Sequence, residues 1–335
     1  MDVILLASAL LLIFAGAELF TNALEHMGHR LRISDGVTGS IFAAVGTALP
    51  ETMVPIIAIC FPDGLHNPET GREVGIGAIL GAPLMLSTLS LFLIAAYAGI
   101  KRGWHSSLLP EREGLLRDLS WFLLAFGLSV LTLFLPHQQQ VARAGVVFML
   151  VLFYFFYVLV TLRASAGLGA EGHGASAESP LHLQRTAFQA SLFVTLIQMA
   201  AGLAGIVYGA HLFVNGVETL AGWLGAPALI ISLLLVPIAT ELPEKINGIL
   251  WIGRNRDTLA IGNITGALVF QGSLLPAIGI SLTSWKPAPP VLLGAGLTLL
   301  AAGYLFLIVR SGRELKPVHF FFNGLCYLAY FTILS

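Results

Sequence analysis

Gly-Thr-Ala-Leu-Pro-Glu at residues 46–51 recurs as Ala-Thr-Glu-Leu-Pro-Glu at residues 239–244. The match extends along the chain at the same shift of 193 residues. Gly-Ala-Glu-Leu-Phe at residues 16–20, for example, aligns with Gly-Ala-His-Leu-Phe at residues 209–213. Self-similarity at a fixed shift is the mark of an internal duplication. The two halves of the chain are therefore expected to share one fold.

The duplicated sequence is unusually apolar. Of its 335 residues, 56% are hydrophobic and only 10% are charged, whereas soluble chains average about 25% charged residues. So few charges cannot cover the surface of a soluble fold, which excludes an ordinary cytosolic enzyme, a nucleic-acid-binding protein and a disordered chain. The apolar runs are far longer than the roughly 10-residue strands of a membrane barrel. The composition predicts an all-α polytopic membrane protein surrounded by the lipid bilayer.

Ten segments are long and apolar enough to span a bilayer, which takes about 20 residues. They are expected at residues 3–24, 37–61, 74–100, 119–135, 142–162, 188–214, 226–252, 258–283, 289–309 and 317–334. The longest connection, at 163–187, is rich in Gly and Ala, which predicts a flexible linker. It separates a first five-helix repeat (1–162) from a second (188–335).

The basic residues predict the orientation of these spans. Apart from Lys245 within a span, only Arg72, Arg143 and Lys286 fall on one side, which leaves 13 of the 17 basic residues on the other. Cytoplasmic loops carry the excess of Lys and Arg. We therefore expect both termini outside, the linker in the cytoplasm, and an integral multi-pass protein of a prokaryotic plasma (inner) membrane.

Five spans per repeat place the second repeat upside down relative to the first. Inverted repeats are the architecture of many secondary transporters, whose substrate sites lie near the midplane at broken helices. An old duplication that now serves only packing is the alternative. The best-matched stretches carry Thr, Pro and Glu in mid-membrane, however, and this favours a site.

Three carboxylates, Glu51, Glu241 and Glu244, lie well inside apolar spans. An ionisable side chain at this depth marks a functional site by default. Pro50 and Pro243 precede two of them and are expected to kink or break their helices, because proline lacks a hydrogen-bond donor and clashes with the preceding turn. A break would free backbone carbonyls beside the carboxylates. The alternative is a pair of carboxylates held protonated and hydrogen-bonded.

Thr47 and Thr240 stand four residues before the two matched glutamates and add hydroxyl and carbonyl oxygens. Together the two halves would form an oxygen-rich cage, which hard cations such as Ca²⁺ and Na⁺ prefer. Asn263 and Gln271 add polar groups in the eighth span. In this part of the chain the two copies align at a shift of 185 residues, because an intervening loop is eight residues shorter in the second copy, and Leu86 is then the counterpart of Gln271. The third span is nearly apolar, so we expect an asymmetric site.

The third and eighth spans also contain Gly-x-x-x-Gly, at residues 77–81 and 262–266, which predicts close helix packing. Glu18 and His211 occupy equivalent positions in the first and sixth spans, and form either a proton-sensitive pair or peripheral interfacial groups. Lys245 directly follows the second motif, and it either neutralises a carboxylate or snorkels away from the site.

These motifs resemble those of the cation/Ca²⁺ exchanger superfamily, which includes the sodium/calcium exchangers. That family reads Gly-Thr-Ser-Leu-Pro-Glu where this chain has residues 46–51 and, in the second copy, 239–244. The resemblance covers nearly the whole chain and implies a sodium/calcium exchanger-like fold of ten transmembrane helices in two inverted repeats. It implies that Glu51 and Glu244 bind the transported cation, that Thr47 and Thr240 assist, and that no cofactor is needed.

The chain departs from the family pattern at several ligand positions. Ala48 and Glu241 replace the serines of the two motifs, Leu86 replaces an Asn, and Gln271 replaces an Asp or Asn. Glu241 restores, from a different helix, the carboxylate lost at Gln271. The identity of the ion and the stoichiometry stay open.

The sequence therefore predicts a secondary active antiporter, not an enzyme, that exchanges Ca²⁺ or another divalent cation against Na⁺ or H⁺ by alternating access. A proton-coupled or other monovalent cation exchanger is one alternative, and a non-transporting cation sensor on the same scaffold is another. An intramembrane hydrolase is disfavoured because the sequence lacks the hydrolytic motifs that such an enzyme needs. For the predicted antiporter, the expected partners are the bilayer and inorganic cations, and the oligomeric state is left open.

Overall fold

The structure is a computed structural model that describes the chain apart from residues 1, 31–42, 62–67, 169–180, 183–191 and 335. The described residues form helices joined by short loops, with no strand among them. They divide into two compact units, each described here by itself. The first unit comprises Met1–Gly71 and Val160–Gly225, and the second comprises Arg72–Leu159 and Ala226–Ser335. Each unit thus combines segments from both sequence repeats.

The length and composition of the helices fit a membrane protein. Within the described ranges, eight helices are long and apolar enough to cross a bilayer, and two shorter apolar helices cover Ala48–Cys60 and Ala228–Thr240. Each of these segments overlaps one of the expected spans. The first of the two short segments follows residues 37–42, which lie outside the described part. The prediction of an all-α polytopic membrane protein is confirmed.

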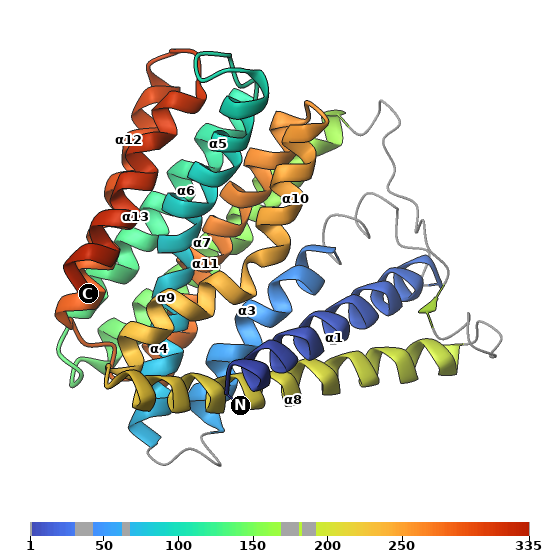
Figure 1. The fold of residues 1–335 in the computed structure, drawn as a ribbon, viewed down its shortest axis with the longest axis vertical. Coiled ribbons are helices and arrows are strands. Elements are labelled where there is room, and N and C mark those ends of the chain that lie inside the picture. The colour runs from blue at the N-terminus through green and yellow to red at the C-terminus, as the bar shows by residue number, and fades with distance from the viewer. Residues whose placement is uncertain (1, 31–42, 62–67, 169–180, 183–191, 335) are drawn as a thin grey trace. The chain divides into compact units, whose positions relative to one another are not determined.

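Three helices form the first unit: α1 (Asp2–Arg30), α3 (Ala43–Cys60) and α8 (Leu192–Leu224). Helices α1 and α8 lie side by side and run in opposite directions (Figure 1), because Gly202 contacts Gly16 whereas Gly216, further along α8, contacts Leu6. Glycines at these positions bring the two backbones together. Asn22 of α1 accepts a hydrogen bond from Gln198 of α8 at 2.9 Å, which adds a polar tie to this close packing.

The second unit contains the remaining helices. They are most of α4 (Pro68–Met85), the π-helical turn η2 (Leu86–Ser90), α5 (Leu91–Arg102), α6 (Arg112–Leu131), η3 (Thr132–Phe134), most of α7 (Gln140–Leu168), α9 (Ala228–Thr240), α10 (Leu242–Gly253), α11 (Asp257–Leu282), α12 (Pro289–Arg310), η6 (Pro317–Phe320) and α13 (Phe321–Leu334). Helix α11 is central, since α5, α6, α10 and η2 all pack against it. Phe122 of α6 packs onto Gly272 of α11, and the Trp285 indole donates to the Ser129 carbonyl at 3.0 Å.

The expected span at 74–100 is not a uniform α-helix. At Leu86–Ser90 the helix widens into a π turn, and the Leu91 N–H bonds to the Leu86 carbonyl five residues back. The Ser87 carbonyl instead accepts a hydrogen bond from the side-chain amide of Asn323 on α13 at 2.7 Å. A partner from another helix therefore satisfies the backbone where the regular pattern is lost, as a low-dielectric environment requires.

Close packing at the two Gly-x-x-x-Gly motifs holds for one copy only. A β-carbon on Gly77 would overlap Ser232 of α9, and one on Gly81 would overlap the Leu233 carbonyl oxygen and lie 2.8 Å from Pro237. No described atom lies within 4 Å of a β-carbon built on Gly262. The expectation is thus right for α4 and wrong for Gly262 on α11, since the spacing does not say which helix face carries a neighbour.

This difference predicts different costs for the same substitution. Gly81→Ala should lower the free energy of unfolding by about 1–3 kcal/mol, because backbone atoms of α9 must move. Gly262→Ala should be neutral or stabilise by up to about 1 kcal/mol, since alanine is the better helix former. Thermal unfolding of the purified variants in detergent measures both effects, and equal midpoints would contradict the close approach at Gly81.

Candidate cation-binding site at a broken helix

The second copy of the motif lies at a break between two helices. Helix α9 ends at Thr240 and α10 begins at Leu242, with Glu241 between them at φ −90° and ψ 7°. Pro243 follows in the first turn of α10, where its missing N–H is tolerated, although it could not continue the hydrogen bonding of α9. The break predicted at Pro243 is therefore confirmed.

The first copy behaves differently. Helix α3 continues from Ala43 to Cys60 through Pro50 and Pro55, so Pro50 does not interrupt it. The Thr52 hydroxyl donates to the Ala48 carbonyl at 2.7 Å, within the turn that contains Pro50. The two copies of the motif are thus similar in sequence but differ in backbone conformation.

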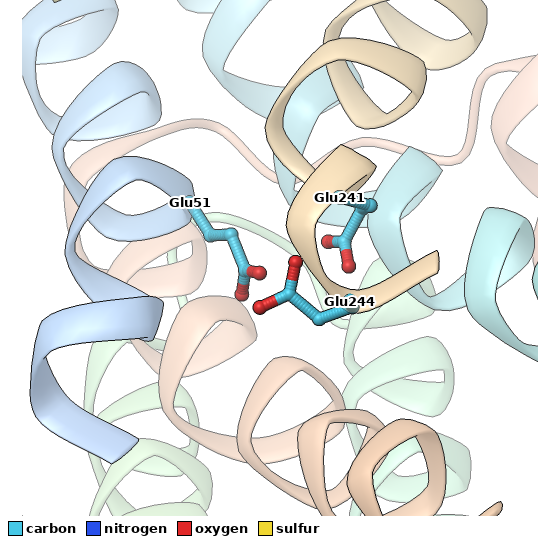
Figure 2. A group of neighbouring side chains, drawn as sticks. All are labelled: Glu51, Glu241 and Glu244. Carbon is cyan, nitrogen blue, oxygen red and sulfur yellow. The ribbon is translucent and has the colours of Figure 1, made fainter. Parts of the chain in front are cut away.

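Two carboxylates meet at the break. Glu241 is fully buried, Glu244 is 5% exposed, and each offers an oxygen within 4.8 Å of the other. Figure 2 shows both side chains projecting from the junction of α9 and α10. Glu244 lies in the first turn of α10, where the positive end of the helix dipole favours a carboxylate.

Neighbouring polar groups support these carboxylates. Gln271 of α11 donates its side-chain N–H to Glu241 Oε1 at 2.6 Å, so the residue that replaces a family carboxylate now holds one. The hydroxyl of Thr240 is buried and donates to the Val236 carbonyl at 3.1 Å. Its oxygen lone pairs remain free to bind a cation. Thr240, Glu241, Glu244 and Gln271 therefore belong to one region of the second unit.

One carboxylate oxygen of Glu244 lacks a donor. Among the described residues, no hydrogen-bond partner reaches the buried Oε2 of Glu244. Leaving a buried charged oxygen unsatisfied, beside a second carboxylate, costs several kcal/mol. A cation or a proton at this place would remove both penalties. The donor set of carboxylate, hydroxyl and amide oxygens suits a hard cation such as Ca²⁺ or Na⁺.

Glu51 belongs to the first unit, where it is buried on α3 at 5% exposure. Figure 2 draws its side chain together with those of Glu241 and Glu244. Thr47 lies on the same helix, but its side chain is outside the part of the chain that the structure describes. The roles of Glu51 and Thr47 therefore stay predictions from the sequence.

Lys245 does not snorkel to the membrane surface. It is 6% exposed, and its ammonium donates to the carbonyls of Pro237 and Ile238 at 3.4 and 3.5 Å. These oxygens belong to the last turn of α9, whose negative dipole end favours a cation. Lys245 thus lies beside the broken helix as a buried positive charge.

Two other predicted groupings are not brought together. Glu18 contacts His182 at 3.2 Å, whereas His211 contacts the ring of Phe61. Because α1 and α8 are antiparallel, equivalent positions of the inverted repeat fall at different heights. Asn263 lies about 12 Å along α11 from Gln271 at 1.5 Å per residue, and its amide nitrogen has no partner among the described residues. Its role in ion binding stays a prediction.

Sequence reasoning missed Asp118. It is 6% exposed and accepts hydrogen bonds from Thr265 at 2.7 Å and Tyr157 at 3.1 Å, which link α6, α7 and α11. The expected span began at residue 119 and so placed this carboxylate at a membrane edge. The signal available was the helical continuity back to Arg112, where α6 begins. Its two hydroxyl donors identify it as a structural tie.

The family model described as sodium/calcium exchanger protein matches residues 1–163 and 194–334. The chain therefore belongs to the sodium/calcium exchanger protein family, as its motifs predicted.

Individual relatives are more distant. CaxA of Alkalimonas amylolytica is 27% identical over 278 residues, covering 81% of this chain and 77% of CaxA. The inner membrane protein YrbG of Escherichia coli is 25% identical over 315 residues, covering 93% of this chain and 90% of YrbG.

Solved structures share the fold. The H⁺/Ca²⁺ exchanger CAX superposes with a TM-score of 0.65 at 16% identity, over 99% of this chain and 87% of CAX. The sodium–calcium exchanger NCX_Mj superposes with a TM-score of 0.57 at 20% identity, over 100% of this chain and 98% of that protein. Because the family consists of secondary transporters, the prediction of a transporter instead of an enzyme is confirmed, as is that of an integral multi-pass membrane protein.

The Gln271–Glu241 hydrogen bond predicts a difference between two positions on one helix. Gln271→Leu should lower the free energy of unfolding by about 1–3 kcal/mol, because a buried carboxylate loses a donor. Asn263→Leu should change it by much less, because the Asn263 amide nitrogen has no described partner to lose. Thermal unfolding in detergent compares the two, and an equal loss would remove Gln271 from the site.

Proposed function

We propose that this chain is a secondary active antiporter that exchanges Ca²⁺, or another divalent cation, against Na⁺ or H⁺ across a prokaryotic plasma membrane. The observation that carries the proposal is the buried pair Glu241 and Glu244 at the helix break, with one Glu244 oxygen lacking a donor among the described residues. Membership of the exchanger family supports the same class of function.

In this proposal Glu51 completes the site from the other repeat. It is the counterpart of Glu244 under the 193-residue shift, and inverted repeats place equivalent positions around a common midplane site. Glu51 and Glu244 are the principal metal ligands, and Thr47 and Thr240 add neutral oxygens. The transported cation is the substrate, and no resident cofactor is required.

Exchange follows from the charge of this site. Empty carboxylates that face each other at low dielectric repel strongly, so an unloaded site resists occlusion. One Ca²⁺, or two or more monovalent cations, neutralises them and allows α1 and α8 to move and change access. Only loaded states then cross, which couples the two fluxes. The grouping of α1 and α8 in one compact unit supports their movement together.

The counter-ion is Na⁺ or H⁺. Fewer neutral oxygen ligands than in the family pattern, with Leu86 and Gln271 at two ligand positions, favour protonation of the carboxylates as the return step. The two proteins of similar structure are a sodium–calcium exchanger and an H⁺/Ca²⁺ exchanger, so the shared fold is compatible with either ion.

Flux through the purified protein tests the function. In liposomes, the parent should take up ⁴⁵Ca²⁺ against an outward Na⁺ or H⁺ gradient, and Glu51→Gln and Glu244→Gln should each reduce uptake by about 100-fold or more, as expected for a buried charged ligand worth about 3 kcal/mol or more. Glu113→Gln, at an exposed carboxylate, is the matched control and should transport like the parent.

The same vesicles identify the counter-ion. Uptake driven by a pH gradient in sodium-free buffer indicates H⁺, and uptake that needs internal Na⁺ and ignores pH indicates Na⁺. Parent-like transport by both Glu51→Gln and Glu244→Gln would contradict the assignment of these residues to the transport site. Ca²⁺ binding without flux would identify a cation sensor on the exchanger scaffold.

The proposal also includes orientation, with both termini outside and the linker at 163–187 in the cytoplasm. In a background without Cys60 and Cys326, Ser176→Cys in the linker should react with a membrane-impermeant thiol reagent only after the membrane is opened. His66→Cys, between the second and third spans, should react in intact spheroplasts. The reverse labelling pattern would invert the topology.

A further inference from the structure

The ammonium of Lys245 occupies a place where a free cation would be favoured. It donates to the Pro237 and Ile238 carbonyls in the last turn of α9 and is 6% exposed. Carbonyls at the C-terminal end of a broken helix are the groups that coordinate small cations in inverted-repeat transporters. The chain therefore places its own ammonium beside carbonyls of this kind.

An acidic residue, Glu241, lies one helical turn before Lys245. Glu241 and Lys245 lie four residues apart and flank the Glu244 position, and the Lys245 backbone N–H bonds to the Glu241 carbonyl at 3.3 Å. In the first repeat the equivalent positions hold Ala48 and Thr52. At these two positions the second repeat thus carries one added carboxylate and one added ammonium. Their charges cancel.

This balance bears on the charge of the site, and here the argument rests on the proposed function. With Glu51 included, three carboxylates and one ammonium leave two negative charges, which one divalent cation neutralises. Without Lys245, three negative charges would remain. Loading with one Ca²⁺ would then leave a buried charge uncompensated, which is costly.

A purely structural cap is the competing explanation, and the chain contains one for comparison. Arg143 is 5% exposed, and its guanidinium donates to the Ile280 and Thr283 carbonyls at 3.0 and 3.2 Å, near the end of α11. It satisfies helix carbonyls as Lys245 does, but it lies near the end of its helix, not at the break. Arg143 is therefore the matched control for capping alone.

We infer that Lys245 is a tethered cation that replaces one monovalent ion in the transport site and thereby sets its capacity at one divalent cation without a co-bound monovalent ion. Lys245 is thus a specificity-determining residue for the exchange. It acts through its fixed positive charge beside Glu241 and Glu244.

The test compares ⁴⁵Ca²⁺ uptake with and without a small monovalent cation on the same side as Ca²⁺. The parent and Lys245→Arg should transport Ca²⁺ when N-methylglucamine is the only other cation at alkaline pH. Lys245→Met should fall by about tenfold or more, as the loss of a close charge pair implies. Na⁺, K⁺ or acid added on the Ca²⁺ side should restore it.

Two further variants separate charge from packing. Glu241→Gln/Lys245→Met removes both added charges and should lose the co-ion requirement. Arg143→Met should lower thermal stability without making Ca²⁺ uptake depend on a co-ion. Uptake by Lys245→Met that needs no co-ion, or the same co-ion requirement in Arg143→Met, would overturn the inference.

If Lys245→Met does not fold, Ca²⁺ binding to detergent-purified protein decides. Glu241→Gln alone leaves Lys245 in excess and should weaken Ca²⁺ binding by about tenfold, and the double variant should recover it. Equal Ca²⁺ affinity in Glu241→Gln and in the double variant would overturn the inference that Lys245 acts as a tethered cation. A parent that neither binds nor transports any divalent cation overturns the proposed function as well, whereas normal parent transport with unaffected variants overturns only this inference.

Discussion

A helix break inside a bilayer exposes backbone groups that water cannot reach, and the second unit is organised around that constraint. Where α9 gives way to α10 at Glu241, the chain must satisfy carbonyls on one side and N–H groups on the other. Lys245 binds the carbonyl end, and Glu244 lies at the N-terminal end of α10. Both charges match the dipole of the helix end that they occupy. The break thus supplies both the reason for the charged residues and their arrangement.

The surrounding helices keep this arrangement in place. Helix α11 delivers Gln271 to Glu241, and it is fixed in turn by Asp118 through Thr265 and by Arg143 at its end. Helix α9 approaches α4 so closely that only glycine fits at position 81. In the proposed cation site such rigid support matters, because small displacements of the ligands change the coordination. The apolar packing of the second unit therefore serves the charged residues at its centre.

The two repeats divide the work unequally. The first keeps a continuous helix through Pro50, whereas the second breaks and carries the additional charges Glu241 and Lys245. A duplicated sequence can diverge in this way because each copy meets different neighbours. In the first unit, α1 and α8 pack closely through glycines, and Gln198 of α8 donates a hydrogen bond to Asn22 of α1. The charged residues at the α9–α10 break and the glycine-packed helices α1 and α8 thus belong to different compact units.

The sequence by itself determined the membrane class, the helical fold, the internal duplication and the family, because these depend on composition, run length and motif, which are properties of the chain. It also located Glu51, Glu241 and Glu244, since a carboxylate in an apolar run is conspicuous in any context. It could not distinguish the two prolines, choose the packed Gly-x-x-x-Gly motif, or see that Glu18 meets His182.

Only the tertiary structure decided that Lys245 turns inward to the α9 carbonyls, that Gln271 supports Glu241, and that Asp118 is buried. The physical reason is that a polar side chain in a membrane goes wherever another helix offers a partner. Which helix lies there is settled by packing between segments far apart in the sequence.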